Sequence, residues 1–197
     1  MNIIDLSHKE DFKRSVLELE NLIIKSAIKF DLLIIVLRAG QHLYDNFQTE
    51  LRAQENLSIK ISRPSTKFKK KFNSNIFLYV PKLINNLLRV IESYSREIIF
   101  SISSAKTTGV ELNLSSVEIK KISICNNILI IDDAIDSGST ISSVISHIIK
   151  INSKADIRVG CITQTFKKPL IHADYCLYKR TIVKFPWSLD SKVSESL

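Results

Sequence analysis

The chain has 197 residues, of which 45% are hydrophobic and 24% charged, and its formal net charge is +8. These proportions are those of an ordinary globular domain, and the length favours one α/β domain with an insertion over two domains. No apolar run is long enough for a membrane span and the N-terminus lacks a signal-peptide layout, so we expect a cytoplasmic location. Cys125, Cys161 and Cys176 form no Cys-x-x-Cys pair, which argues against structural zinc and predicts buried, reduced thiols.

The positive charge is concentrated in one segment. No acidic residue occurs between Glu55 and Glu92, and the cations of that interval account for the whole excess: Lys60, Arg63, Lys67, Lys69, Lys70, Lys71, Lys82 and Arg89. Our preferred interpretation is a solvated basic lobe that steers anionic substrates. The alternative is a nucleic-acid surface, because the stretch RPSTKFKKKF has the charge for phosphate backbones and two interleaved aromatic residues.

Helix and strand patterns alternate through the first part of the chain. A capping-box pattern begins at Ser7, and the continuous apolar run after Asp31 is typical of a strand buried on both faces. The expected elements are a helix over residues 9–29, a strand over 32–37, a helix that buries Leu43, Tyr44, Phe47 and Leu51, and a short strand over 57–62. Arg38, Ala39 and Gly40 would form the loop that follows the first buried strand.

The middle of the chain combines a helix with a polar loop. Pro81 is placed to begin a helix, and apolar residues recur on one face of it: Ile84, Leu87, Leu88, Ile91 and Tyr94. We expect this stripe to face the core, while a dimer contact or a membrane surface stays open as an alternative. Residues 98–102 predict another strand, and residues 103–113 predict a polar loop leading into a hairpin.

The most informative stretch is NILIIDDAIDSGSTI, residues 127–141. Four apolar residues predict a buried strand, and the residues from Ile141 onward have helical spacing, so the acidic and hydroxyl residues lie in the turn between them. The first amides of a helix lack partners and can bind a phosphate group. Gly138 allows a close backbone approach, and the neighbouring hydroxyls of Ser137, Ser139 and Thr140 can donate to phosphate oxygens.

Acids beside a phosphate are repelled unless they face hydroxyl groups or a divalent metal, which a sugar phosphate can provide. The stretch from Ile128 to Thr140 resembles, without a break, the phosphoribosyl diphosphate (PRPP) signature of type I phosphoribosyltransferases: four hydrophobic residues, two acids, two hydrophobic residues, then Asp-Ser-Gly-x-Thr. The alternative is a surface turn with an N-capping serine and incidental acids.

Other segments carry the same resemblance. It implies a mainly parallel sheet flanked by helices, with a small hood, in one domain over residues 1–197. Leu37-Arg38-Ala39-Gly40 is similar to the family's pyrophosphate loop, with Ala39 replacing a glycine, and Thr107-Thr108-Gly109 is similar to its flexible catalytic loop. A plain surface hairpin explains the second segment equally well. Residues 57–96 would then be an insertion and residues 166–190 the hood, whose Pro186-Trp187 resembles the close of xanthine phosphoribosyltransferases.

The resemblance implies displacement of pyrophosphate from PRPP by an acceptor, most simply a purine-type base. Asp132 and Asp133 would hold the ribose hydroxyls directly or through Mg²⁺, and Asp190 could help to bind a second metal or be a solvated tail acid. The implied PRPP-binding residues are Asp132, Asp133, Asp136, Ser137, Gly138, Ser139, Thr140, Ile141, Arg38, Ala39 and Gly40. Asp136 would be the general base, and Arg38 and Lys106 would stabilise the leaving pyrophosphate.

The acceptor is the least determined part. Lys167 or Lys168 would contact an oxo group of the base, but Ile182 lies where such enzymes place a stacking aromatic residue. A non-base acceptor such as a sugar or a lipid carrier therefore stays open. So does a PRPP- or nucleotide-sensing regulator on the same fold that binds nucleic acid. The partners we expect are PRPP, a small-molecule acceptor and a second copy of the chain.

Overall fold

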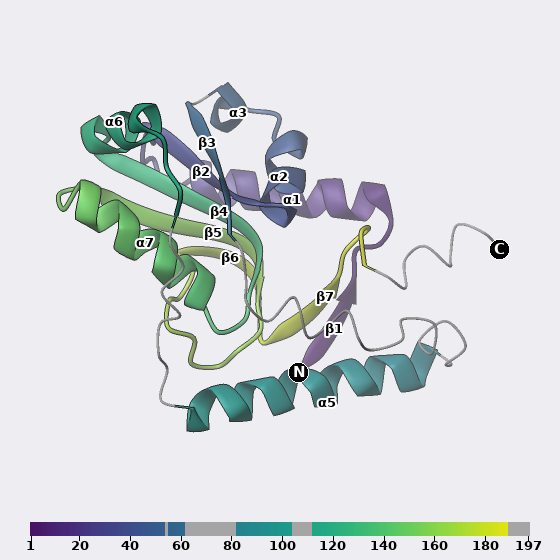
Figure 1. Ribbon diagram of the computed structural model, residues 1–197. Coiled ribbons are helices and arrows are strands. Elements are labelled where there is room, and N and C mark those ends of the chain that lie inside the picture. The colour runs from purple at the N-terminus through teal and green to yellow at the C-terminus, as the bar shows by residue number, and fades with distance from the viewer. Residues whose placement is uncertain (54, 62–81, 104–111, 189–197) are drawn as a thin grey trace.

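The computed structural model describes residues 1–53, 55–61, 82–103 and 112–188 (Figure 1). Its strands are β1 (Asn2–Asp5), β2 (Leu32–Leu37), β3 (Asn56–Lys60), β4 (Asn127–Ile135), β5 (Asp156–Gln164), β6 (Tyr175–Lys179) and β7 (Thr181–Lys184). Its helices are α1 (Lys9–Ile24), α2 (Ala39–Asn46), α3 (Glu50–Ala53), α5 (Lys82–Ile102), α6 (Ser116–Ile124) and α7 (Ser139–Ile151).

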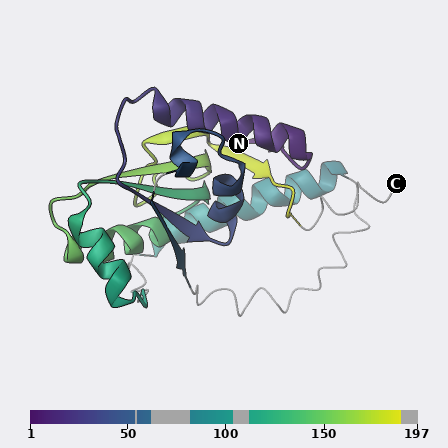
Figure 2. The same ribbon diagram turned by 90° about the horizontal axis from the view of Figure 1, so that it is seen from above.

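A five-stranded parallel sheet in the order β3-β2-β4-β5-β6 forms the centre. Helices α1 and α2 cover one face, and α6 and α7 cover the other (Figures 1 and 2). The expected run of residues 32–37 is strand β2, and its first five residues are buried. Because neighbouring strand residues point to opposite faces, Leu33 and Leu129 pack toward α1 while Ile34 and Ile130 pack toward α7.

A separate two-stranded sheet contains a strand that the sequence pattern did not reveal. β1 pairs in parallel with β7, so that Ile3 lies opposite Ile182. Strand β6 lies within residues 166–190, which were expected to form the hood, but it pairs with β5 at the edge of the central sheet. β1 has only four residues and lacks a clear alternation of buried and exposed positions, so its pairing depends on the distant β7.

Three expectations about helices were wrong. The first helix ends at Ile24 and not at residue 29, because the chain turns at Ala27, whose φ is 57°. Residues 98–102 are not a strand but the last part of α5. The hairpin expected after the polar loop gives way to α6, which begins at a complete capping box formed by Ser115 and Glu118.

We expected the apolar stripe of α5 to face the core, but it does not. The isoleucines and leucines from Ile84 to Ile102 are exposed, and the side chains that face the body of the molecule include the buried Asn85 and Ser93. None of the helices within the described ranges is long and apolar enough to cross a bilayer. Two of the three cysteines, Cys125 and Cys161, are buried free thiols, and Cys176 is partly buried.

Candidate active site

The strand that carries the acidic pair continues further than the sequence indicated. β4 runs to Ile135, so Asp132 and Asp133 lie in its last part and not in the turn after it. Asp132 is buried, with 3% of its surface exposed, and accepts a hydrogen bond from the amide of Asp133 at 3.0 Å. Consecutive strand residues point to opposite faces, so the two carboxylates are turned to different sides of the sheet.

The turn from β4 into α7 is held in one conformation. Gly138 has φ 74°, and a Cβ at this position would lie 2.9 Å from the amide nitrogen of Ile171. The carbonyl of Ser137 accepts a hydrogen bond from the amide of Leu170 at 2.8 Å, which ties the turn to the loop after β5. Glycine is required here by both its dihedral angle and the lack of space.

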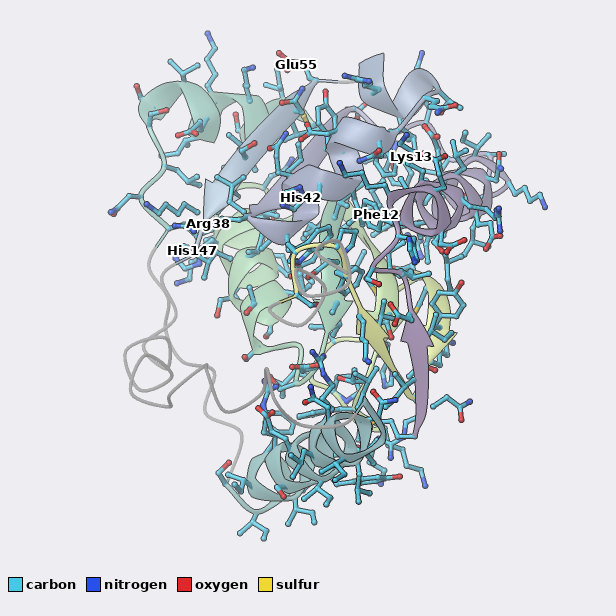
Figure 3. All side chains as sticks on the ribbon, turned by 90° about the vertical axis from the view of Figure 1, so that its right-hand side faces the viewer. Phe12, Lys13, Arg38, His42, Glu55 and His147 are labelled. Carbon is cyan, nitrogen blue, oxygen red and sulfur yellow. The ribbon has the colours of Figure 1, made fainter. Side chains whose placement is uncertain are left out.

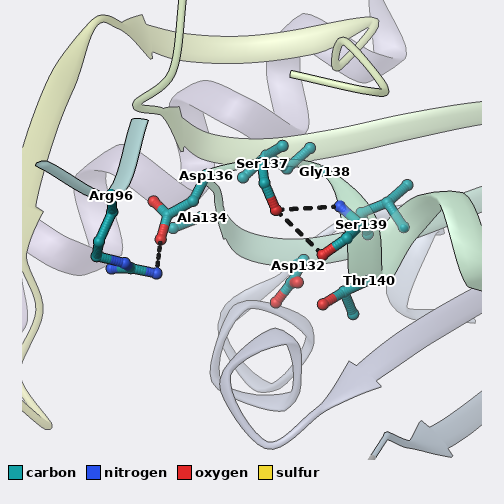
Figure 4. Close-up of a pocket in the computed structure, with 10 residues that line it drawn as sticks. Arg96, Asp132, Ala134, Asp136, Ser137, Gly138, Ser139 and Thr140 are labelled. Atoms are coloured by element: carbon teal, nitrogen blue, oxygen red, sulfur yellow. Dashed lines mark hydrogen bonds and ion pairs between the residues drawn. The ribbon is translucent and has the colours of Figure 1, made fainter. Parts of the chain in front are cut away.

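A cavity of about 180 Å³ lies in front of this turn (Figure 4). The hydroxyls of Ser137 and Ser139 lie 3.0 Å apart at its edge, and the amide of Ser139 donates to the Ser137 hydroxyl at 3.4 Å. Its lining residues are Arg96, Asp132, Ala134, Ile135, Asp136, Ser137, Gly138, Ser139, Thr140 and Ile141. The cavity therefore combines the N-terminus of a 13-residue helix with hydroxyl donors and one buried carboxylate.

Asp136 is engaged on both oxygens. Its Oδ1 accepts a hydrogen bond from the hydroxyl of Thr165, and its Oδ2 lies 2.8 Å from Nη2 of Arg96. Arg96 comes from α5, 40 residues earlier in the chain. Sequence reasoning missed both partners, and only the apolar periodicity of residues 84–102 could have indicated the helix that carries Arg96.

A second interaction joins α5 to the loop after β5. Glu97 accepts hydrogen bonds from Nη1 of Arg180 at 2.6 and 2.7 Å and from the amide of Lys167 at 2.6 Å. Burial alone would raise the pKa of the Glu97 carboxyl, but these hydrogen bonds and the charge of Arg180 outweigh burial and lower it. The same hydrogen bonds raise the pKa of Arg180. The carboxylate is thus held in its charged form.

The two lysines that were expected to contact the acceptor base line a separate cavity of about 330 Å³. Lys167 and Lys168 lie on one side of it with Arg180, and α5 forms the other side through Glu97, Ile98, Ser101 and Ile102. Ile182 is a partly buried residue of β7 and is not among the lining residues of this cavity. The aromatic ring of Trp187 stacks on His42, with centroids 4.3 Å apart, so the Pro-Trp close packs against α2.

Arg38, Ala39 and Gly40 were expected to form a loop, but Ala39 and Gly40 are the first residues of α2. The segment lies beside the acidic pair and outside the first cavity. A Cβ on Gly40 would lie 2.6 Å from the carbonyl oxygen of Ile131, the residue before Asp132, so α2 begins directly against β4. Arg38 precedes α2, and Figure 3 shows it together with His42. Gly40 thus allows the start of α2 to lie directly against the carboxyl end of the sheet.

Two of the predicted site residues, Lys106 and Asp190, lie outside the described residues, as do Thr107, Thr108 and Gly109. Within the described part of the chain, no group of three or more His, Cys, Asp or Glu side chains could hold a metal ion. A magnesium ion would still fit, because it is commonly bound by one or two carboxylates together with the phosphate oxygens of a substrate. Asp132 offers such an oxygen at the cavity.

No family model matches this sequence, and no curated protein matches it. Three solved structures resemble the fold, each with a TM-score of 0.57. A purine phosphoribosyltransferase from Pyrococcus horikoshii is 16% identical and matches over 95% of each chain. A xanthine-guanine-hypoxanthine phosphoribosyltransferase from Helicobacter pylori is 15% identical and matches over the whole of both chains. A hypothetical protein from Neisseria gonorrhoeae with bound ppGpp is 14% identical, over 100% of this chain and 96% of that one. The fold is that of type I phosphoribosyltransferases, as the sequence predicted.

Proposed function

We propose that this chain, which has the type I phosphoribosyltransferase fold, transfers the 5-phosphoribosyl group of PRPP to an acceptor and releases pyrophosphate. The observation that supports this most is the cavity at the start of α7, where amides, hydroxyls and the buried Asp132 converge. The amides of residues 136–141 and the hydroxyls of Ser137, Ser139 and Thr140 would bind the 5′-phosphate. The substrate would thereby be anchored at its unreactive end.

The two acids would act from opposite sides of the strand. Asp132 would accept a hydrogen bond from a ribose hydroxyl within the cavity, and Asp133 would face the side of Arg38, Ala39 and Gly40. Mg²⁺, when bound by these carboxylates and the substrate, would neutralise charge on the leaving pyrophosphate. Arg38 and the two amides after it would stabilise the same group, and Lys106 and Asp190 remain proposed contributors.

Asp136 would accept the proton of the incoming acceptor. Because Thr165 and Arg96 occupy its two oxygens, the acceptor must replace Arg96 at Oδ2 before proton transfer. A purine-type base would bring its oxo group toward Lys167 or Lys168, in the cavity beside α5. This step requires α5 to shift or Arg96 to change its rotamer.

The direct test is pyrophosphate release from PRPP and Mg²⁺ with hypoxanthine, guanine, xanthine, adenine and uracil supplied separately. We expect release with an oxo-purine, and loss of at least about a hundredfold in kcat/KM when Asp132→Asn and Asp133→Asn are combined. Circular dichroism would check that the double variant is folded. Asp45→Asn, on the exposed side of α2, is the control and should keep the turnover of the wild type. Full turnover in the folded double variant would contradict the proposal.

The second candidate is a nucleotide sensor without transferase activity. It is supported by the likeness to the Neisseria gonorrhoeae protein with bound ppGpp and by the occupied state of Asp136. In that case PRPP or guanosine nucleotides would bind, with no pyrophosphate released for any base. If the acceptor is not a base, pyrophosphate should be released slowly when a cell extract is added and not at all with the purified bases.

A further inference from the structure

Helix α5 presents its apolar face to solvent. Seven isoleucine and leucine side chains on this outward face are between 42% and 78% exposed: Ile84, Leu87, Leu88, Ile91, Ile98, Ile99 and Ile102. The helix lies along one side of the molecule, and its outward side chains extend away from the body (Figures 1 and 3). An amphipathic helix normally places such a stripe against the core.

The orientation of α5 is determined by its polar side. Arg96 binds Asp136, Glu97 binds Arg180, and the hydroxyl of Tyr94 accepts from the N-terminal amine at 3.3 Å. Phe100 contacts Phe166 with ring centroids 5.8 Å apart, on the same side as Glu97. Rotating the helix to bury its stripe would break both ion pairs at the candidate site.

The stripe is regular and straight. Ile84, Ile91 and Ile98 recur at seven-residue intervals, and Leu88 and Ile102 lie on the same side. A 21-residue helix is about 31 Å long, so the stripe runs along nearly the whole length of α5. Isoleucine and leucine at heptad spacing favour contact with another helix. A stripe of one residue class is also self-complementary, as a two-fold interface requires.

The exposed area is that of an interface. From their exposed fractions, the seven side chains leave on the order of 700 Å² in contact with solvent, against roughly 300–600 Å² for the largest apolar patch of a typical monomer. A stable interface of standard size buries about 800 Å² on each partner, so the stripe supplies most of one side of it.

A lipid surface fits this face less well. Helices that lie on membranes turn lysines and arginines toward the headgroups at the edges of the apolar face. Here the arginines of α5 point the other way, since Arg96 binds Asp136 and Arg89 is partly buried, and the exposed charge of α5 beside the stripe is the acidic Glu92. Exposed lysines adjoin the stripe at Ile98 and Ile102, where Lys167 and Lys168 line the same cavity.

We propose that the outward face of α5 is a self-association interface that packs against the same face of a second copy of this chain. Because the opposite face of α5 binds Asp136 and Arg180, the second copy would also hold Arg96 and Glu97 in place over the candidate site. The interface goes beyond the proposed transfer reaction, and its C-terminal end adjoins the candidate site, because Ile98 and Ile102 also line the cavity beside Lys167 and Lys168.

The test compares two triple variants of the full chain by sedimentation velocity and light scattering, over about a hundredfold range of concentration. Leu87→Ser, Leu88→Ser and Ile91→Ser remove the middle of the stripe and leave the residues that line the cavity beside Lys167 unchanged. Val117→Ser, Ile119→Ser and Ile124→Ser remove comparably exposed residues of α6, on the other side of the molecule. We expect a dimer for the wild type and the α6 variant and a folded monomer for the α5 variant, with at least a hundredfold weaker association.

A cysteine substitution gives a second measurement that does not depend on destabilising the helix. Ser95 lies among the outward residues of α5, and Ser123 is an exposed serine of α6. Under mild oxidation, Ser95→Cys should give a disulfide-linked dimer and Ser123→Cys should not. A wild-type protein that stays monomeric overturns the proposal, as does a dimer that survives the α5 changes. A monomer that floats with anionic vesicles and loses this on removal of the stripe would assign the face to lipid.

Discussion

Gly138 determines the backbone conformation of the turn that lines the cavity at the start of α7. Its φ of 74° lies in the left-handed region, and a side chain would meet backbone atoms of Ile171, which cannot rotate away. We expect Gly138→Ala to lower the free energy of unfolding by about 2 kcal/mol and to weaken PRPP binding, because the turn must open to accommodate the methyl group. Urea unfolding and isothermal titration calorimetry would measure the two effects.

Gly160 provides the matched control. It lies in β5 without a positive φ, and an added Cβ would lie 3.4 Å from Cδ1 of Ile23, a flexible side-chain end. Gly160→Ala should therefore cost less than about 1 kcal/mol and leave PRPP binding unchanged. Equal effects of the two substitutions would mean that the turn at Gly138 does not shape the ligand site.

At the scale of elements, the unit of β4, turn and α7 could be predicted from the sequence because its signals are local. An apolar run, a glycine and a helical period follow one another within 25 residues, from Asn127 to Ile151. The contribution of α5 could not be predicted in this way. Amphipathic spacing shows that a helix has two faces, but it does not show which face the rest of the molecule covers.

The end of α5 illustrates the same limit. Ile98, Ile99 and Phe100 form a short apolar run that fits a strand, yet the helical period of Ile84, Leu88, Ile91 and Ile98 continues to Ile102. Arg96 and Glu97 have no local pattern at all, since their partners Asp136 and Arg180 are far along the chain. Long-range ion pairs of this kind emerge only from the packed structure.

The attachment of α5 should depend on pH through Glu97. Its pKa is lowered below the ordinary value of 4.5, so its charged hydrogen bonds stabilise the fold above that pH and are lost as the pH falls below it. When the pH is lowered from neutral to below about 4, the free energy of unfolding of the wild type should fall by about 1 kcal/mol more than that of Glu97→Gln. The variant has no charge at this position to lose. Urea unfolding at several pH values would measure the difference.

Glu10→Gln is the control for this comparison. Glu10 pairs with Lys13 at 3.0 Å on an exposed surface, where an ion pair contributes little. The free energy of unfolding of Glu10→Gln should depend on pH in the same way as that of the wild type. If Glu97→Gln also follows the wild type, the contact with Arg180 does not hold α5 in solution.

At the scale of the whole molecule, the parallel sheet gives the protein two unlike ends. Every strand of the central sheet ends at the same edge, so β3 delivers the chain there, at Lys60, just before the basic segment. The sequence places the whole charge excess between Glu55 and Glu92. The chain thus enters the basic segment from the edge of the sheet at which the cavity at the start of α7 lies. We expect the positive charge of this segment to raise the rate of encounter with an anionic substrate.

Replacing Lys67, Lys69, Lys70 and Lys71 by glutamine should slow PRPP association several-fold at low ionic strength and leave dissociation unchanged, because steering acts before contact. Stopped-flow binding at increasing salt would show the difference vanish as charges are screened. The control replaces four exposed lysines near the opposite edge, after α1 and at the end of α7: Lys25, Lys29, Lys150 and Lys154. These changes alter the net charge equally and should not slow PRPP association. Equal rates for both variants would exclude steering.

A nucleic-acid affinity that falls steeply with salt and disappears only in the first variant would instead assign the segment to a nucleic-acid partner.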